Sequence, residues 1–181
     1  MNLIEFRRTA GGTYHSTKHW KHLSSEDKHK RFWSFHRSNY GKSFSIYAGV
    51  SIATLLREKQ YSIEHIVPRS YIDSHLSNCT TEIRYGATIN PFNLVASHKR
   101  INSRRGSASF DFDEDLVKKS YCTRFSSVHN NQIGFDNQGE WIVPYRSRGD
   151  IARAILYMHL IYPLPSLPTS EVETLVKWGK M

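Results

Sequence analysis

An acid and an imidazole stand side by side in the stretch SIEHIVPRS (62–70), where Glu64 precedes His65. Histidine titrates near neutral pH, which suits proton transfer but also many structural purposes. On a regular strand, neighbouring side chains point to opposite faces, so the dipeptide alone favours one buried and one solvated group. Pro68 ends regular strand pairing, and a twist near His65 could bring both groups to one end of the strand.

A second cluster, HKRINSRR (98–105), combines positive charge with a single carboxamide. Its four cations form a surface suited to phosphate groups, and the side-chain oxygen of Asn102 is a hard ligand suited to Mg²⁺, Mn²⁺ or Ca²⁺. The cations are Lys99, Arg100, Arg104 and Arg105. Taken alone, the cluster fits better with a solvated basic helix end, which the helix dipole favours.

A third group of charges surrounds Asp150, with Arg148 before it and Arg153 after it. These arginines could line a phosphate track, or they could brace the start of a helix against carboxylates, and the sequence leaves both open. No phosphate-binding G-x-x-x-x-G-K-[ST] loop is present, so nucleotide hydrolysis by that route has no support.

The composition describes a basic globular protein of 181 residues with a formal net charge of +9. Such an excess favours polyanionic partners, nucleic acid first, although a solvated basic surface without a partner is the alternative. Two cysteines exclude a disulfide framework or a cysteine-only zinc site. No apolar run is long enough for a membrane span, and the start MNLIEFRRTAGG lacks the apolar core of a secretory signal. We therefore expect an intracellular protein without a membrane partner.

The middle of the chain must position the first two clusters. Residues 61–68 are rich in β-formers and predict a strand that Pro68 closes. Residues 72–90 have few hydrophobic anchors and predict a loop. The run from Val95 to Ile101 predicts the start of a helix that Gly106 ends.

The flanking regions predict further helices. Ser25 is a candidate N-cap, followed by two acidic residues in the first turn. Residues 123–145 have the turn residues of a hairpin or long loop. Asp150 is the candidate N-cap of a helix that Pro163 stops, and residues 169–181 predict a short closing helix. The pattern as a whole predicts mixed α and β structure in one domain.

Together and in this order, the clusters resemble the endonuclease I family of nucleases, within the ββα-metal (His-Me finger) superfamily. The blocks are IEHIVPRS, NPFNLVASHKRINSRRGSASF, RGDIARAILYM and LVKW. They run from about residue 61 to 178, whereas residues 1–60 show no match. The resemblance implies an α+β fold in a single domain, built around a ββα-metal finger with surrounding helices. Residues 61–181 would form the nuclease region, and the basic, aromatic residues 1–60 would belong to the same domain as a further DNA-contact surface.

The resemblance also implies roles for the matched residues. His65 would be the general base that activates water, and Glu64 and Asn102 would hold one divalent ion. That ion would be Mg²⁺, with Mn²⁺ or Ca²⁺ also suited to the site. Arg105 would fix Asn102 or clamp the scissile phosphate. The products would carry 5′-phosphate and 3′-hydroxyl ends.

The implied substrate is DNA, double-stranded in the first instance, with RNA as a further candidate. The cations expected to contact it are Arg69, Arg84, Lys99, Arg100, Arg104, Arg148 and Arg153. The expected activity is therefore that of a metal-dependent endonuclease.

Three departures from the family pattern keep alternatives open. Asn90 stands where the family usually has Asp, Phe92 where it has His, and Ala96 where it has Pro. The first two could remove a group that supports the metal ligands. One alternative is therefore a DNA-binding protein that lost catalysis. Another is a site-specific, homing- or restriction-like nuclease that reads bases through residues 14–41. An intracellular location would also be consistent with a nuclease that a phage or virus encodes.

Overall fold

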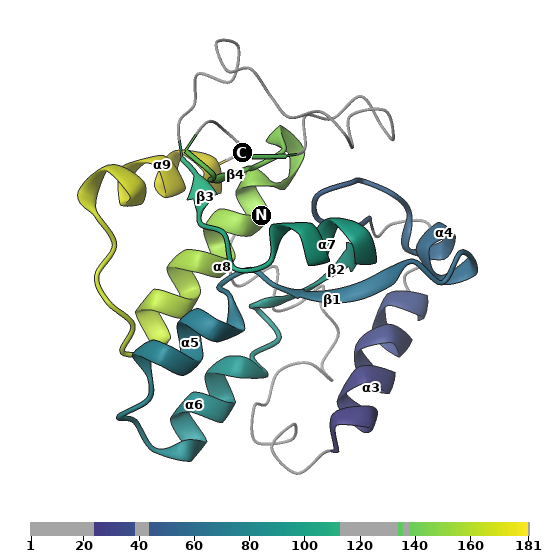
Figure 1. The fold of residues 1–181 in the computed structure, drawn as a ribbon, viewed down its shortest axis with the longest axis horizontal. Helices are drawn as coiled ribbons and strands as arrows, with labels where there is room; N and C mark the ends of the chain where they lie inside the picture. The colour runs from purple at the N-terminus through teal and green to yellow at the C-terminus, as the bar shows by residue number, and fades with distance from the viewer. Residues whose placement is uncertain (1–23, 39–43, 113–133, 136–137, 181) are drawn as a thin grey trace.

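Helices surround two small sheets in the computed structural model, which describes residues 24–38, 44–112, 134–135 and 138–180 (Figure 1). The protein therefore has the expected α+β fold. The elements, in chain order, are α3 (Ser25–Ser38), α4 (Ile52–Arg57), β1 (Tyr61–His65), α5 (Arg69–His75), α6 (Thr81–Thr88), β2 (Leu94–His98), α7 (Lys99–Arg105), β3 (Phe110–Asp111), β4 (Trp141–Ile142), the 3₁₀ turn η3 (Tyr145–Ser147), α8 (Arg148–Ile161) and α9 (Thr169–Gly179).

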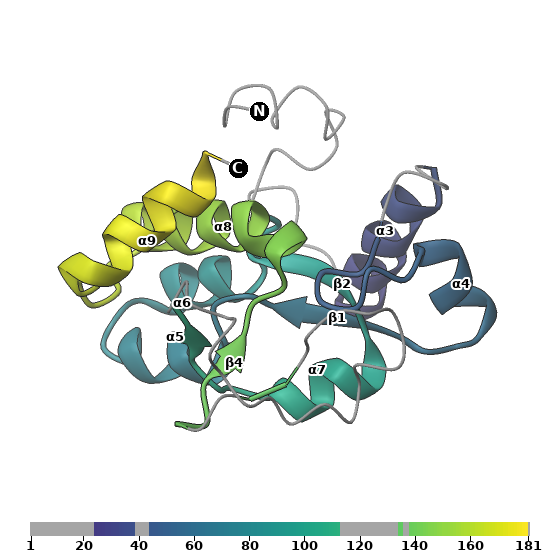
Figure 2. The same cartoon turned by 90° about the horizontal axis from the view of Figure 1, so that it is seen from above.

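The centre of the fold is a ββα unit made of β1, β2 and α7. The two strands pair antiparallel, and their register sets Glu64 opposite Val95 and His65 opposite Leu94. Helix α7 follows β2 without a loop and packs against both strands (Figures 1 and 2). The strand predicted over 61–68 is thus confirmed, although it ends earlier, at His65.

The helix predicted to start between Val95 and Ile101 begins later than expected. Residues 94–98 form β2, because pairing with β1 decides the conformation of a short apolar run that has no clear periodicity of its own. The helix starts after His98, whose Nδ1 accepts a hydrogen bond from the Arg100 backbone N–H at 3.2 Å. Gly106 ends it with a φ of 56°, as predicted.

The loop predicted over residues 72–90 is wrong, because this region forms most of α5 and all of α6. Thr80 caps α6 by accepting a hydrogen bond from the Ile83 N–H. A few buried apolar residues anchor these helices: Ile72 and Leu76 are both 0% exposed. Both helices lie near the end of β1 from which the chain enters α5 (Figure 1).

Other boundaries differ by one or two residues. Ser24, rather than Ser25, caps α3, since its Oγ accepts from the Asp27 N–H at 3.0 Å. Helix α8 begins at Arg148, which places Asp150 in its first turn instead of at the N-cap. The closing helix is confirmed as α9. Most of the predicted hairpin or loop at 123–145 lies outside the described residues, and its Trp141–Ile142 part pairs in parallel with β3.

One apolar cluster joins the described N-terminal residues to the rest of the chain. It runs from Phe32 in α3 to Trp178 in α9. The backbone N–H of Ile46 also donates to the Ala96 carbonyl of β2 at 2.9 Å. The described part of 1–60 therefore shares a core with the ββα unit, while its contact with DNA stays a prediction. Among the described helices, none has the length and apolar character that crossing a membrane requires.

The turn after β1 depends on Asn93, which is 0% exposed. Its Oδ1 accepts from the Val67 N–H at 2.7 Å, and its Nδ2 donates to the Val67 carbonyl at 2.9 Å. Replacing Asn93 by Ala leaves both buried backbone groups unpaired, so we expect the free energy of unfolding to fall by about 2 kcal/mol. Urea denaturation measures this. The matched change Asn78→Ala at an exposed position should alter it by less than about 0.5 kcal/mol.

Candidate functional site

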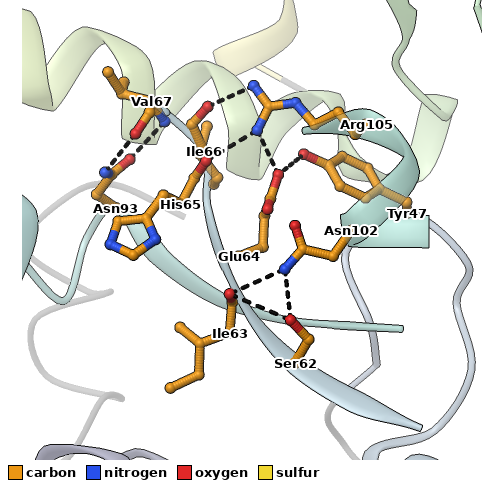
Figure 3. A network of polar contacts seen from close by, with 10 residues as sticks. All are labelled: Tyr47, Ser62, Ile63, Glu64, His65, Ile66, Val67, Asn93, Asn102 and Arg105. Atoms are coloured by element: carbon orange, nitrogen blue, oxygen red, sulfur yellow. Dashed lines mark hydrogen bonds and ion pairs between the residues drawn. The ribbon is translucent and has the colours of Figure 1, made fainter. Parts of the chain in front are cut away.

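Glu64, His65 and Asn102 line one open pocket of about 270 Å³. Glu64 lies inside β1, whereas His65 is its last residue, and Pro68 also lines the pocket. The neighbours can therefore share a site because the regular alternation of the strand stops at His65. Figure 3 shows the imidazole on one side of the strand end and Asn102 on the other side of Glu64.

The carboxylate of Glu64 is buried and held by two donors. The side chain of Glu64 is 3% exposed, and its Oε1 accepts from the Tyr47 hydroxyl at 2.6 Å and from Nη1 of Arg105 (Figure 3). Burial raises the pKa of Glu64, and the charge of Arg105 together with these hydrogen bonds opposes the rise. The two donors thus favour the ionised form that binds cations.

The imidazole of His65 is oriented by a backbone carbonyl. Its Nε2 lies 3.0 Å from the Thr88 oxygen at the end of α6. A carbonyl oxygen only accepts, so Nε2 must carry the proton and Nδ1 must hold the lone pair. Burial lowers the pKa of His65, against the effect of the Thr88 bond, and so favours the neutral ring. The ring is therefore arranged to accept a proton at Nδ1.

The amide of Asn102 is fixed through its nitrogen. Nδ2 donates to Ser62 Oγ at 2.6 Å and to the Ile63 carbonyl at 3.0 Å, which joins α7 to β1. Because both bonds use the nitrogen, Oδ1 is left to accept or to bind a cation. In Figure 3 this oxygen lies on the side that faces Glu64.

Arg105 holds the end of β1 instead of contacting Asn102 or reaching solvent. Its side chain is 1% exposed and pairs with Glu64. Nη1 also donates to the His65 carbonyl and Nη2 to the Ile66 carbonyl, both at 2.9 Å. The sequence predicted a clamp on Asn102 or on the phosphate, and the structure places the guanidinium on Glu64 instead. We therefore assign Arg105 a positioning role.

Tyr47 and Thr88 complete the site, and sequence reasoning missed both. Tyr47 is 0% exposed and lies in an apolar stretch before α4, where nothing marks it as polar support for Glu64. Thr88 contributes only its backbone oxygen, so its side-chain type carries no signal. Both contacts join segments that only the folded chain brings together.

Three of the predicted DNA-contacting cations have accessible side chains. Arg69 lines the pocket, and its side chain is 69% exposed although it approaches Asp73 at 3.4 Å. Lys99 and Arg100 are exposed in the first turn of α7. Arg69 is therefore in a position to meet a phosphate that enters the pocket, whereas Lys99 and Arg100 are exposed on the same helix as Asn102.

The remaining predicted cations are less accessible. Arg84 and Arg104 are half-buried, and Arg104 lies 5.8 Å from the ring centre of Phe135. Arg148 is 6% exposed and stacks on Trp178 at 5.0 Å. The side chain of Arg153 is 24% exposed and pairs with Asp150 at 2.5 Å. For Arg148 and Arg153 this geometry fits a brace at the start of α8, and contact with DNA stays a prediction.

The two departures that could weaken metal support are used structurally. Asn90 is 1% exposed, donates to the Tyr162 hydroxyl at 2.9 Å and accepts from the Phe92 N–H at 2.9 Å. Phe92 stacks with Tyr157, with ring centres 4.4 Å apart. Neither position supplies a polar group to the pocket.

The donor set fits a hard divalent ion bound mainly by water. Within the described ranges, no group of three or more His, Cys, Asp or Glu side chains could hold a metal. The pocket offers one carboxylate and one amide oxygen, Glu64 and Asn102. Mg²⁺ commonly keeps several waters and takes one or two protein oxygens, so these residues suit it better than a metal that needs a full protein cage.

Comparison with known proteins extends the sequence evidence. A search of the curated proteins finds no match. The family model described as Endonuclease I matches residues 4–175. The match therefore includes nearly all of the N-terminal region, in which the sequence motifs alone showed no resemblance. Given this match along almost the whole chain, the protein belongs to the endonuclease I family.

Proposed function

We propose that this protein is a Mg²⁺-dependent DNA endonuclease of the His-Me finger type, which leaves 5′-phosphate and 3′-hydroxyl ends. The family supports a nuclease that acts on nucleic acid. The observation that carries the finer proposal is the convergence of Glu64, His65 and Asn102 on one pocket. A protein that only binds DNA has no need for an oriented base beside two oxygen ligands.

The residues of the chain divide the reaction between them. His65 accepts a proton from water at Nδ1, while the Thr88 carbonyl keeps the opposite nitrogen protonated. Glu64 and Asn102 would hold the ion, with Arg105 and Tyr47 fixing the Glu64 carboxylate. The bound ion would supply positive charge for the transition state and for the departing 3′ oxygen.

Substrate binding would rest on the phosphate backbone. The net charge of +9 attracts a polyanion, Arg69 lies exposed at the pocket, and Lys99 and Arg100 are exposed on α7. Phosphate contacts position a nucleic acid without reading its sequence. Double-stranded DNA is the proposed substrate, and RNA is the alternative.

The first prediction from this proposal concerns His65. We expect His65→Ala to slow the nicking of supercoiled plasmid by about 10²- to 10⁴-fold, because a positioned general base contributes that much. Gel assays with Mg²⁺, Mn²⁺ or Ca²⁺, and with EDTA, measure the rate. His29→Gln, which changes an exposed histidine on α3, is the control and should cut like the wild type. Absence of nicking by the wild type with every ion would refute the proposal.

The second prediction concerns Tyr47, whose hydroxyl touches the proposed metal ligand Glu64. Tyr47→Phe removes only that hydroxyl, so we expect Mn²⁺ affinity to fall by about tenfold, as for other residues that orient metal ligands. Titration followed by electron paramagnetic resonance measures binding without any turnover. Tyr145→Phe, at a side chain that is 70% exposed, is the matched control. Equal Mn²⁺ affinity in both variants would show that the Tyr47 hydroxyl does not support metal binding.

The third prediction concerns Arg69. We expect Arg69→Ala to weaken DNA binding about equally for all sequences and to reduce the slope of log affinity against log salt by about 1. Fluorescence anisotropy in EDTA, over a range of salt concentrations, separates binding from cutting. Arg57→Ala on α4, also an exposed arginine, is the control and should keep the wild-type slope. If Arg69→Ala leaves the slope of log affinity against log salt unchanged, Arg69 does not contact the DNA.

A further inference from the structure

The turn over residues 45–50 carries the tyrosine that supports Glu64. The turn closes on itself, because the Ser45 N–H donates to the Val50 carbonyl at 2.8 Å. From this turn the Tyr47 hydroxyl donates to the Glu64 carboxylate at 2.6 Å (Figure 3). The position of that hydroxyl therefore depends on where the backbone of the turn lies.

Two residues of η3 hold the backbone of this turn. Nη2 of Arg146 donates to the Tyr47 carbonyl at 2.6 Å, and the Ser147 hydroxyl donates to the Ile46 carbonyl. The two carbonyls are consecutive in the chain and belong to residues that are 7% and 0% exposed. A buried carbonyl needs a donor, so these bonds fix the turn from a segment that lies 99 residues further along the chain.

Gly49 leaves the space that the guanidinium of Arg146 occupies. A Cβ at this position would overlap the Nη1 and Cζ atoms of Arg146. Gly49 also has a φ of 62°, in the left-handed region that glycine adopts without steric cost. The other described glycines with a positive φ, Gly106 and Gly139, have no atom within 4 Å of such a Cβ. The close approach of a side chain is therefore a particular feature of Gly49.

We propose that Arg146 is a positioning residue for the proposed metal site and acts on Glu64 through Tyr47. The inference rests on the proposed nuclease function. Arg146 fixes the backbone of Tyr47, and the Tyr47 hydroxyl in turn fixes the carboxylate that would bind the ion. Gly49 admits the guanidinium to the turn. The segment that leads into α8 is thus linked to the pocket at β1, although no residue of η3 lines that pocket.

The Mn²⁺ affinity of Arg146→Ala tests this role without any cutting. We expect electron paramagnetic resonance titration to show a loss of about three- to tenfold, and no more than Tyr47→Phe causes, because Arg146 acts only through that tyrosine. Arg57→Ala removes an exposed arginine and should bind Mn²⁺ like the wild type. Wild-type affinity in Arg146→Ala would overturn the proposal. If DNA binding in EDTA then fell, Arg146 would be a phosphate contact instead.

A double-mutant cycle separates action through Tyr47 from a general structural role. In Tyr47→Phe the hydroxyl is already gone, so adding Arg146→Ala should weaken Mn²⁺ binding by less than about twofold. If the two residues contributed independently, their separate losses would multiply in the double variant. That result would overturn the proposal.

Gly49→Ala tests the same contact while Arg146 remains in the chain. The added methyl group would displace the guanidinium, so we expect Mn²⁺ affinity to fall about as far as in Arg146→Ala. Gly139→Ala is the matched control, since its φ is 82° and its Cβ would meet no atom within 4 Å. It introduces backbone strain alone and should bind Mn²⁺ like the wild type. Wild-type affinity in Gly49→Ala would overturn the proposal.

NMR of ring-labelled tyrosine keeps the outcome separate from that of the nuclease proposal. The signal of Tyr47 is identified by its absence in Tyr47→Phe. We expect this signal to shift in Arg146→Ala and to stay in place in Arg57→Ala. If the wild type neither binds Mn²⁺ nor cuts nucleic acid, the nuclease proposal fails. The Tyr47 signal then still decides the contact: a shift in Arg146→Ala supports it, and an unshifted signal overturns it.

Discussion

The buried ion pair between Glu64 and Arg105 is the interaction on which the site depends. A carboxylate that is 3% exposed has lost most of its hydration, which costs several kcal/mol unless a partner offsets it. Arg105 is that partner, and its further bonds to the His65 and Ile66 carbonyls tie the last turn of α7 to the end of β1. The position of Glu64 is therefore a consequence of packing the ββα unit.

The same unit gathers support from distant parts of the chain. Tyr47 reaches Glu64 from the segment before α4, Thr88 orients His65 from the end of α6, and Asn93 fixes the turn at Val67. The first two contacts join β1 to a segment that packs against it, and the third holds the turn that follows β1. A two-stranded sheet is marginal by itself, so these helices and loops provide the rigidity that a catalytic geometry needs.

The sequence predicted some elements better than others for physical reasons. Strand β1 and helix α9 carry local signals, namely β-formers before a proline in β1 and an acidic first turn followed by apolar residues in α9. Helices α5 and α6 were missed because their stability comes from burying a few residues such as Ile72 and Leu76, which is a property of the packed core. The sequence predicts the start of a helix where β2 forms, because the conformation of this segment depends on pairing with β1.

The sequence by itself determined the residue types and their order: an acid and an imidazole at a strand end, then an amide among cations. It also carried enough pattern for the family to be expected from residues 61–178. Only the tertiary structure decided that Glu64 and His65 share a pocket, that His65 presents Nδ1, and that Arg105 serves Glu64. Those facts depend on hydrogen bonds between residues far apart in the chain. The local sequence around each residue does not determine which distant residue it will contact.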